Sequence, residues 1–221
     1  MFIHKHPYPP FIQNDTEKLI VGTLPPPRFS MGELLEKDVD FCYGSYYNSL
    51  WLYIDKLHNL NLRYDNSQEA INERIAFLIQ HRIGVCDIVG QCERSKIDAS
   101  DLGMSNIKLR NVIGYLKQFP SIKTLLFTGG NSKNGPEYLF RKHLKDYGLE
   151  LKLVSNEIPR IHEFQLIENS KTRTLKTVSL TSPSGSANRA IGSMPFYKQL
   201  KNKDSKFSTF DFRVMQYRDF F

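Results

Sequence analysis

The sequence predicts a three-layer α/β/α domain around a central sheet of four to five mostly parallel strands. Short apolar segments that suit buried strands alternate along the chain with longer segments whose apolar residues recur at helical spacing. Two loops rich in glycine, proline or serine, residues 22–27 and 181–188, each follow such a strand. Parallel strands place their ligand-binding loops at the carboxyl edge of the sheet, so we expect both loops there.

The composition fits a single globular domain that spans residues 1–221. Of these residues, 40% are hydrophobic and 12% are aromatic, which is enough for a sizeable core. No apolar run reaches the roughly 20 residues needed to cross a bilayer, and no signal peptide is recognisable, so we expect a cytoplasmic protein without a membrane partner. The net charge of +7 is compatible with a polyanionic partner but does not identify one.

Cysteine and histidine usage indicates neither a disulfide framework nor a metal centre. The three cysteines contain no CxxC pair, so we interpret them as buried free thiols. His4 and His6 have a spacing that a metal could use, but the proline-rich residues 1–17 around them favour an extended arm. We therefore expect no metal and no redox cofactor.

The first part of the chain predicts one strand and two helices. These elements lie at 18–21, at about 48–60 and at 67–81. The apolar face of the first helix includes Trp51, which is therefore expected in the core. Ser67 or Asn66 is the expected N-cap of the second helix.

The middle of the chain continues this alternation. The predicted elements are a strand at 83–89, a helix at 107–119, a strand at 124–127, a helix at 136–147 and a strand at 149–154. The polar residues 91–106, between the first strand and the first helix, predict a long loop. Long loops in compact domains are frequently functional.

The last part departs from the alternation. Residues from about 155 to 180 predict a β-hairpin insertion with a polar turn at 168–171. Its basic residues, including Arg173, form either a solvated face or a nucleic-acid contact. The aromatic tail, from about 205 to 221, is expected to pack on the domain or on a second subunit, so the oligomeric state stays open.

Several short segments, in a fixed order, carry a family resemblance. They are GTLPP at 22–26, YGSYYNSLW at 43–51, CDIVGQCERSKID at 86–98, FTG at 127–129 and LTSPSGSAN at 180–188. Together they resemble motifs of the uracil-DNA glycosylase superfamily, most closely of its hypoxanthine-DNA (deoxyinosine) glycosylase branch. The resemblance implies a uracil-DNA glycosylase-like fold and a monofunctional enzyme of base-excision repair. Such an enzyme hydrolyses the N-glycosidic bond of uracil or hypoxanthine in DNA.

The chemistry of that reaction suggests roles for two residues. A base inside a duplex must be flipped into a pocket and held there by stacking and by hydrogen bonds to its edge. Tyr43 matches the stacking aromatic of the family, and its alternative interpretation is a core tyrosine. The carboxamide of Asn48 can complement the N–H and C=O groups that uracil and hypoxanthine share, and its alternative role is to cap the following helix.

The resemblance also assigns the remaining site residues, which lie mostly in the two loops. The expected base-binding residues are Gly22, Thr23, Leu24, Pro25, Tyr43 and Asn48. The expected catalytic residues, which supply donors to the oxygen of the departing base, are Asn48, Ser182 and Ser184. The residues expected to contact DNA phosphates are Ser184, Ser186, Asn188 and Arg189.

The chain departs from the family pattern at two positions of the first loop. Leu24 stands where many superfamily members place an Asp or Asn that positions the attacking water, so the water-activating group is unidentified. Pro26 removes a backbone N–H donor. No lysine in these motifs suits Schiff-base chemistry, so no lyase step is expected.

Two other functions stay open. A glycosylase-fold protein that has lost catalysis would bind DNA or a nucleotide, and would show salt-dependent DNA binding without base release. A small-molecule α/β enzyme would bind a phosphate at the Gly/Pro loop. Residues 22–27 lack the glycine spacing of a P-loop or a dinucleotide fingerprint, which speaks against this alternative.

Overall fold

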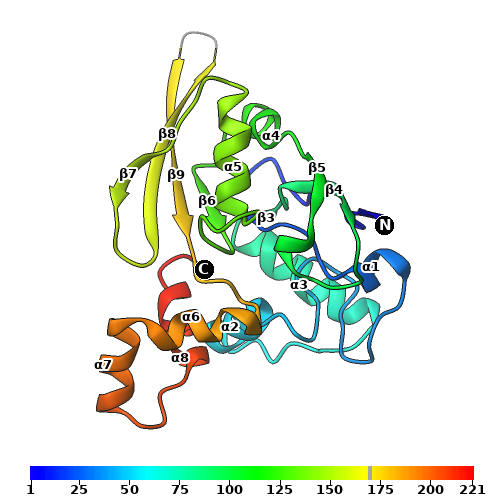
Figure 1. The fold of residues 1–221 in the computed structure, drawn as a ribbon, viewed down its shortest axis with the longest axis vertical. Helices are drawn as coiled ribbons and strands as arrows, with labels where there is room; N and C mark the ends of the chain where they lie inside the picture. Colours follow the sequence, from blue (N-terminus) through cyan, green and yellow to red (C-terminus); the bar gives the residue numbers. More distant parts are fainter. Residues whose placement is uncertain (169–170) are drawn as a thin grey trace.

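The computed structural model describes residues 1–168 and 171–221 and has a six-stranded sheet at its centre (Figure 1). In spatial order the strands are β3 (Ile83–Val85), β2 (Lys18–Val21), β6 (Thr124–Phe127), β9 (Lys171–Ser179), β8 (Arg160–Glu168) and β7 (Lys152–Ser155). The first four strands run parallel, whereas β8 and β7 are antiparallel to their neighbours. The predicted mostly parallel α/β sheet is confirmed, with six strands where four to five were expected.

Helices cover both faces of this sheet. One face carries α4 (Val112–Gln118) and α5 (Pro136–Lys145), and the other carries α2 (Leu50–His58), α3 (Gln68–Gln80) and α8 (Thr209–Tyr217). Side chains of β2 alternate between the two layers, because Leu19 and Val21 pack with α4 and α5 while Ile20 packs with α2 and α3. Strands buried on both faces read as continuous apolar runs, which is why the sequence revealed them.

Several local predictions for the helices are confirmed. The Ser67 side chain caps α3 by accepting a hydrogen bond from Ala70 N–H. Trp51 is 2% exposed and donates its indole N–H to the Cys42 carbonyl, so it is a core residue. The aromatic tail folds as α8 against α2, where the Tyr53 and Tyr217 rings lie 5.1 Å apart.

The N-terminal segment differs from the predicted extended arm. β1 (Phe2–Lys5), β4 (Val89–Arg94) and β5 (Ser105–Leu109) form a second, antiparallel sheet beside the first. The predicted loop at 91–106, the single strand at 83–89 and the helix start at 107 were therefore wrong. These strands are polar and are held by pairing with distant segments, so local apolar periodicity could not reveal them.

The predicted hairpin is confirmed as β8 and β9, but it is not an insertion. β9 pairs with β6 and therefore belongs to the parallel part of the central sheet. Of the predicted turn at 168–171, residues 169 and 170 lie outside the described residues. Arg173 donates to the carbonyls of Pro120 and Ile122 at 2.8 Å, and also to Leu116, so it holds the end of α4.

The remaining helices follow the two loops singled out above. They are α1 (Pro27–Met31), α6 (Asn188–Ser193) and α7 (Pro195–Lys203), with short 3-10 turns η1 (Asp101–Gly103) and η2 (Gly185–Ala187). The strand predicted at 149–154 is β7, which begins at Lys152. In the described part of the chain, no helix is both long and apolar enough to cross a membrane.

Candidate active site

The two small-residue loops, 22–27 and 181–188, follow the carboxyl ends of β2 and β9 and line one cleft, as predicted from the parallel sheet. Asn48 and Ser184 form an isolated antiparallel β-bridge. The next residue, Ser49, donates its backbone N–H to the Pro183 carbonyl at 3.1 Å. Segments more than 130 positions apart in the sequence are thereby fastened to each other beside the start of α2.

A cleft of about 520 Å³ opens where these loops meet. Eight of the predicted site residues line it: Thr23, Leu24, Pro25, Tyr43, Asn48, Ser182, Ser184 and Ser186. Three further segments contribute to its wall. They are the N-terminal segment with His6 and Tyr8, residues 99–102 after β4, and residues 132–133 after β6. A cleft of this volume fits a base and part of its sugar.

Three predicted residues lie elsewhere. Gly22 is behind the wall, where its N–H donates to Asp87 at 2.8 Å. Asn188 turns its side chain toward the tail, because its Oδ1 accepts from Arg213 at 2.7 Å. Arg189 is exposed and does not line the cleft. The predicted base contact of Gly22 is therefore indirect, and Asn188 holds α8 rather than facing the cleft.

Tyr43 stands between the cleft and the sheet in a constrained conformation. Its φ of 59° is in the left-handed region, and its hydroxyl donates to Asp87 Oδ1 at 2.7 Å. A Cβ on Gly22 would lie 2.3 Å from that hydroxyl, and one on Gly44 would lie 1.9 Å from the Val39 carbonyl oxygen. Burial raises the pKa of Tyr43 well above its ordinary value, so the phenol stays protonated and donates.

Asn48 is not the N-cap of α2, because Ser49 occupies that position and makes no side-chain cap hydrogen bond. The Asn48 side chain instead holds the turn into the helix, where its Oδ1 accepts the Leu50 N–H at 3.0 Å, two residues ahead. Its Nδ2 group donates no hydrogen bond to any described residue. The turn uses one lone pair of the oxygen and neither amide proton.

Asp87 is a site residue that the sequence analysis missed. Only 6% exposed, it accepts from Gly22 N–H, from the Tyr43 hydroxyl and, at 2.9 Å, from His6 Nε2. His6 Nδ1 accepts the Tyr8 N–H, so Nε2 carries the proton that it donates. Burial alone would raise the pKa of Asp87, but these hydrogen bonds outweigh it and hold the pKa below its ordinary value.

Asp101 lies on another wall of the cleft and was also missed. It belongs to the turn η1 between β4 and β5, and its Oδ1 accepts the Thr23 hydroxyl at 2.7 Å. Its backbone carbonyl accepts from Asn134 Nδ2 at 3.0 Å. Burial raises the pKa of Asp101 above its ordinary value, and the Thr23 hydrogen bond and the charge of Arg94 offset this only in part.

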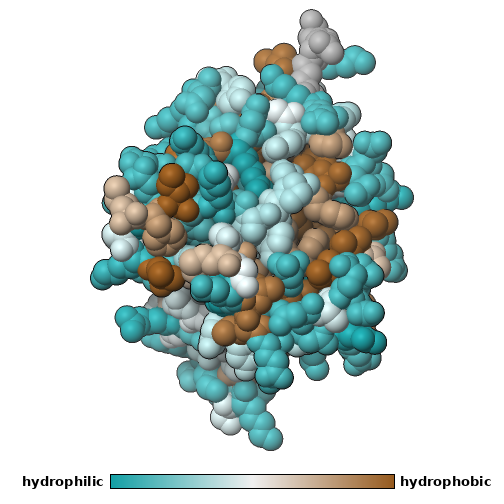
Figure 2. Space-filling view, turned by 90° about the vertical axis from the view of Figure 1, so that its right-hand side faces the viewer, coloured by the Kyte–Doolittle hydropathy of each residue, from teal (hydrophilic) through white to brown (hydrophobic). Residues whose placement is uncertain are grey.

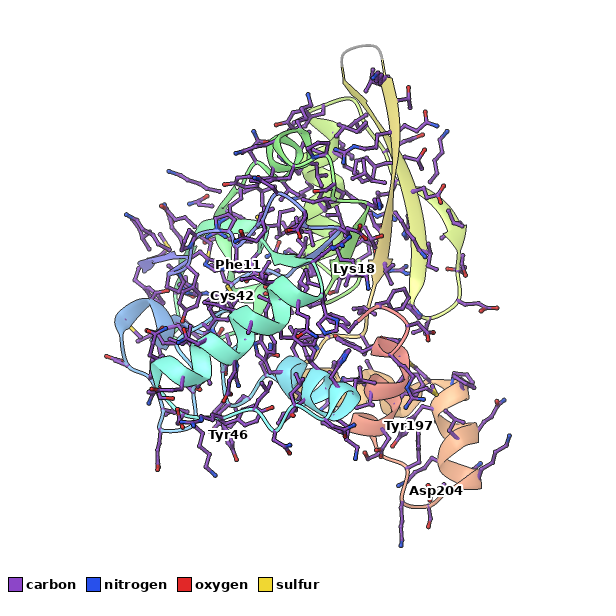
Figure 3. The ribbon with its side chains drawn as sticks, turned by 180° about the vertical axis from the view of Figure 1, so that it is seen from behind. Phe11, Lys18, Cys42, Tyr46, Tyr197 and Asp204 are labelled. Atoms are coloured by element: carbon purple, nitrogen blue, oxygen red, sulfur yellow. The ribbon has the colours of Figure 1, made fainter. Side chains whose placement is uncertain are left out.

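The loop before Tyr43 and Asn48 is held by a buried carboxylate. Asp38 is fully buried and accepts from the Arg28 guanidinium at 2.7 and 2.8 Å and from the Tyr46 N–H at 2.7 Å. The Tyr46 and Tyr47 rings form an exposed edge-to-face pair, 5.3 Å apart. In Figure 3, Tyr46 lies at the lower left, on the surface of the molecule, while Cys42 lies inside.

The β4–β5 connection forms part of the molecular surface beside the cleft. Figure 2 looks at the side that lies on the right in Figure 1, where hydrophilic side chains cover most of the face and hydrophobic ones gather in a band across its middle. The connection exposes Ile97 and Leu102, which are 72% and 68% exposed. Leu102 also lines the cleft, so this wall continues to the surface.

The structure gives the two N-terminal histidines separate partners. His4 Nδ1 accepts from Arg94 Nε at 3.0 Å, whereas His6 binds Asp87. Among the described residues, no group of three or more His, Cys, Asp or Glu side chains is arranged to hold a metal ion.

Comparison of the chain with models of protein families, with curated proteins and with solved structures finds no match. The functional interpretation consequently depends on the geometry of the cleft and on the motif resemblance.

Proposed function

We propose that this protein is a hydrolase of N-glycosidic bonds in DNA. Within that class, we propose a monofunctional DNA glycosylase that removes uracil or hypoxanthine in base-excision repair. The observation that carries the proposal is the position of Asn48, whose free amide protons border the same cleft as the Tyr43 ring and the serine loop.

The cleft has the groups that hold a flipped base. Tyr43 offers an aromatic wall fixed by its hydroxyl, and stacking on such a ring stabilises a base outside the helix. The amide protons of Asn48 suit a carbonyl oxygen, which uracil and hypoxanthine carry where cytosine and adenine have an amino group. A base with that amino group would meet donor against donor, so Asn48 would discriminate against cytosine and adenine.

The same arrangement suits the departure of the base. As the glycosidic bond breaks, negative charge moves onto the carbonyl oxygen of the base, and a donor already in place stabilises that charge. Asn48 is held by the hydrogen bond that it accepts from Leu50 N–H and by the bridge to Ser184, so it does not need to reorganise during the reaction.

DNA phosphates would lie at the rim of the cleft. Ser184 and Ser186 line the cleft, with their hydroxyls 3.0 Å apart, and Lys133 lines it as well. Hydroxyl groups and a lysine are common partners of phosphate oxygens. The net charge of +7 supports a polyanionic substrate.

The test is release of free base from oligonucleotides that contain one modified base each. We expect the wild-type protein to release uracil or hypoxanthine, and we expect Asn48→Ala to lose this activity. Salt-dependent DNA binding with no release of any base would instead select the non-catalytic alternative. Absence of both binding and release would refute the proposed function.

A further inference from the structure

Hydrolysis requires a group that holds and activates water, and the first loop does not supply one. Leu24 is apolar and packs against the core cluster on the α4 and α5 side of the sheet. Among the described residues that line the cleft, the only carboxylates are Asp87 and Asp101. His6 also lines the cleft, but its Nε2 binds Asp87 and its Nδ1 accepts the Tyr8 N–H, so one of these two carboxylates is the available base.

Both carboxylate oxygens of Asp87 already accept hydrogen bonds from the protein. Its Oδ1 accepts from Gly22 N–H and from the Tyr43 hydroxyl, and its Oδ2 accepts from His6. Moving it toward a water would break hydrogen bonds that hold Tyr43. Asp87 is a positioning residue.

Asp101 is held in place by hydrogen bonds, but only one of its two carboxylate oxygens accepts one from the protein. Its backbone carbonyl is fixed by Asn134 Nδ2 and by the Met104 N–H at 3.1 Å, and its Oδ1 accepts the Thr23 hydroxyl. Its Oδ2 accepts no hydrogen bond from any described residue. Thr23 immediately precedes Leu24, so the carboxylate borders the part of the loop that lacks a water-holding side chain.

We propose that Asp101 activates the water that attacks the sugar in the glycosylase reaction. The inference rests on the proposed function. The water oxygen forms a bond to C1′ of the deoxyribose while the bond from C1′ to the base nitrogen breaks and its electron pair leaves with the base. Asp101 takes the proton of the water, and the proton later passes to the released base or to solvent. The products are the free base and an abasic sugar.

The charged groups around Asp101 fit this role. Arg94 of β4 and Asp87 act on it through their charges, and they oppose each other. His6 and Lys133 line other walls of the same cleft. The carboxylate negative charge also stabilises the positive charge that develops on the sugar in the transition state.

The test compares Asp101→Asn with Asp204→Asn. Asparagine at 101 keeps an acceptor for Thr23 but cannot take a proton. Asp204 is exposed, does not line the cleft, and accepts the Lys206 N–H at 2.9 Å, which makes Asp204→Asn the control. We expect Asp101→Asn to lower kcat by about 100- to 10,000-fold, with unchanged affinity for an uncleavable 2′-fluoro substrate analogue. Asp204→Asn should keep wild-type kcat.

The pH profile separates catalysis from a structural role. Wild-type activity should fall as the pH drops through the raised pKa of Asp101, and this acid limb should vanish in Asp101→Asn. Thr23→Val removes the hydrogen bond that lowers this pKa, so it should move the acid limb to higher pH. Wild-type kcat in Asp101→Asn, or an unchanged acid limb, overturns the inference while leaving the proposed function intact. A wild-type protein that releases no base overturns both.

Discussion

Two carboxylates, Asp87 and Asp101, line one cleft, and their surroundings shift their pKa values in opposite directions. Asp87 accepts three hydrogen bonds and has a lowered pKa, whereas Asp101 accepts one on its side chain and has a raised pKa. Hydrogen bonds to both oxygens of a carboxylate stabilise the anion and lower its pKa. A buried carboxylate that accepts fewer hydrogen bonds is more easily protonated, so its pKa rises. Environments that push two pKa values apart separate a supporting role from a chemical one.

The largest expected effect comes from removing the paired carboxylate. Asp87→Ala leaves Gly22 N–H, the Tyr43 hydroxyl and the His6 ring without their acceptor in a buried site. We expect the free energy of unfolding to fall by about 3 to 5 kcal/mol, measured by urea denaturation. Asp101→Asn is the comparison and should cost far less. Equal losses in the two variants would contradict the distinction between them.

Gly22→Ala tests whether the contact between Tyr43 and Asp87 needs an open backbone. The added Cβ would lie 2.3 Å from the Tyr43 hydroxyl and 2.8 Å from Asp87 Oδ1. We expect a loss of about 1 to 3 kcal/mol in thermal or urea unfolding. Gly192→Ala, where no atom lies within 4 Å of the new Cβ, is the control and should not destabilise the protein. A stable Gly22→Ala protein would show that this packing is looser than described.

Tyr43→Phe separates the ring from its hydroxyl. The change removes one hydrogen bond to Asp87 and should cost about 1 kcal/mol of stability. Base release should continue, because the stacking ring remains, whereas Tyr43→Ala should abolish it. If Tyr43→Phe abolishes base release as Tyr43→Ala does, the Tyr43 hydroxyl takes part in the reaction, contrary to its assignment as a positioning group.

The smallest effect is on the pH dependence of stability. The pKa of Asp87 is lowered on folding, so its contribution is present at neutral pH and is lost as the pH falls through its folded pKa. The pKa of Asp101 is raised, so its contribution is present in acid and is lost as the pH rises through its folded pKa. Melting temperatures of Asp101→Asn should therefore equal or exceed wild type at neutral pH and lose that advantage in acid. A deficit at neutral pH that disappears in acid would reverse the assigned sign.

The sequence could predict what depends on local pattern. Buried parallel strands such as residues 18–21 and 124–127, and the loops at their carboxyl ends, follow from apolar runs and small residues. The position of residues 22–27 and 181–188 at one edge of the sheet follows from the geometry of parallel strands. The motif resemblance predicts Tyr43 and Asn48 as site residues, and both line the cleft.

What the sequence could not predict depends on contacts between distant segments. His6 reaches Asp87 only because β1 pairs with β4, and strands as polar as β4 carry no clear periodicity. Asp101 reaches Thr23 through the long polar segment after β4, whose length indicates a functional loop but does not indicate which of its residues lines the cleft. The one available signal was Asp87 itself, an acidic residue inside an apolar run, since a buried charge requires partners.

Asn48 is proposed to read the base through its free amide protons. Asn48→Asp isolates this contact, because aspartate can still accept the Leu50 N–H but cannot donate to a carbonyl oxygen. The measurement is the single-turnover rate of base release from uracil- and hypoxanthine-containing DNA, alongside the melting temperature. We predict wild-type stability with release reduced by at least about 100-fold, the size seen when a transition-state donor is removed. Release at the wild-type rate by a stably folded Asn48→Asp protein would contradict the account.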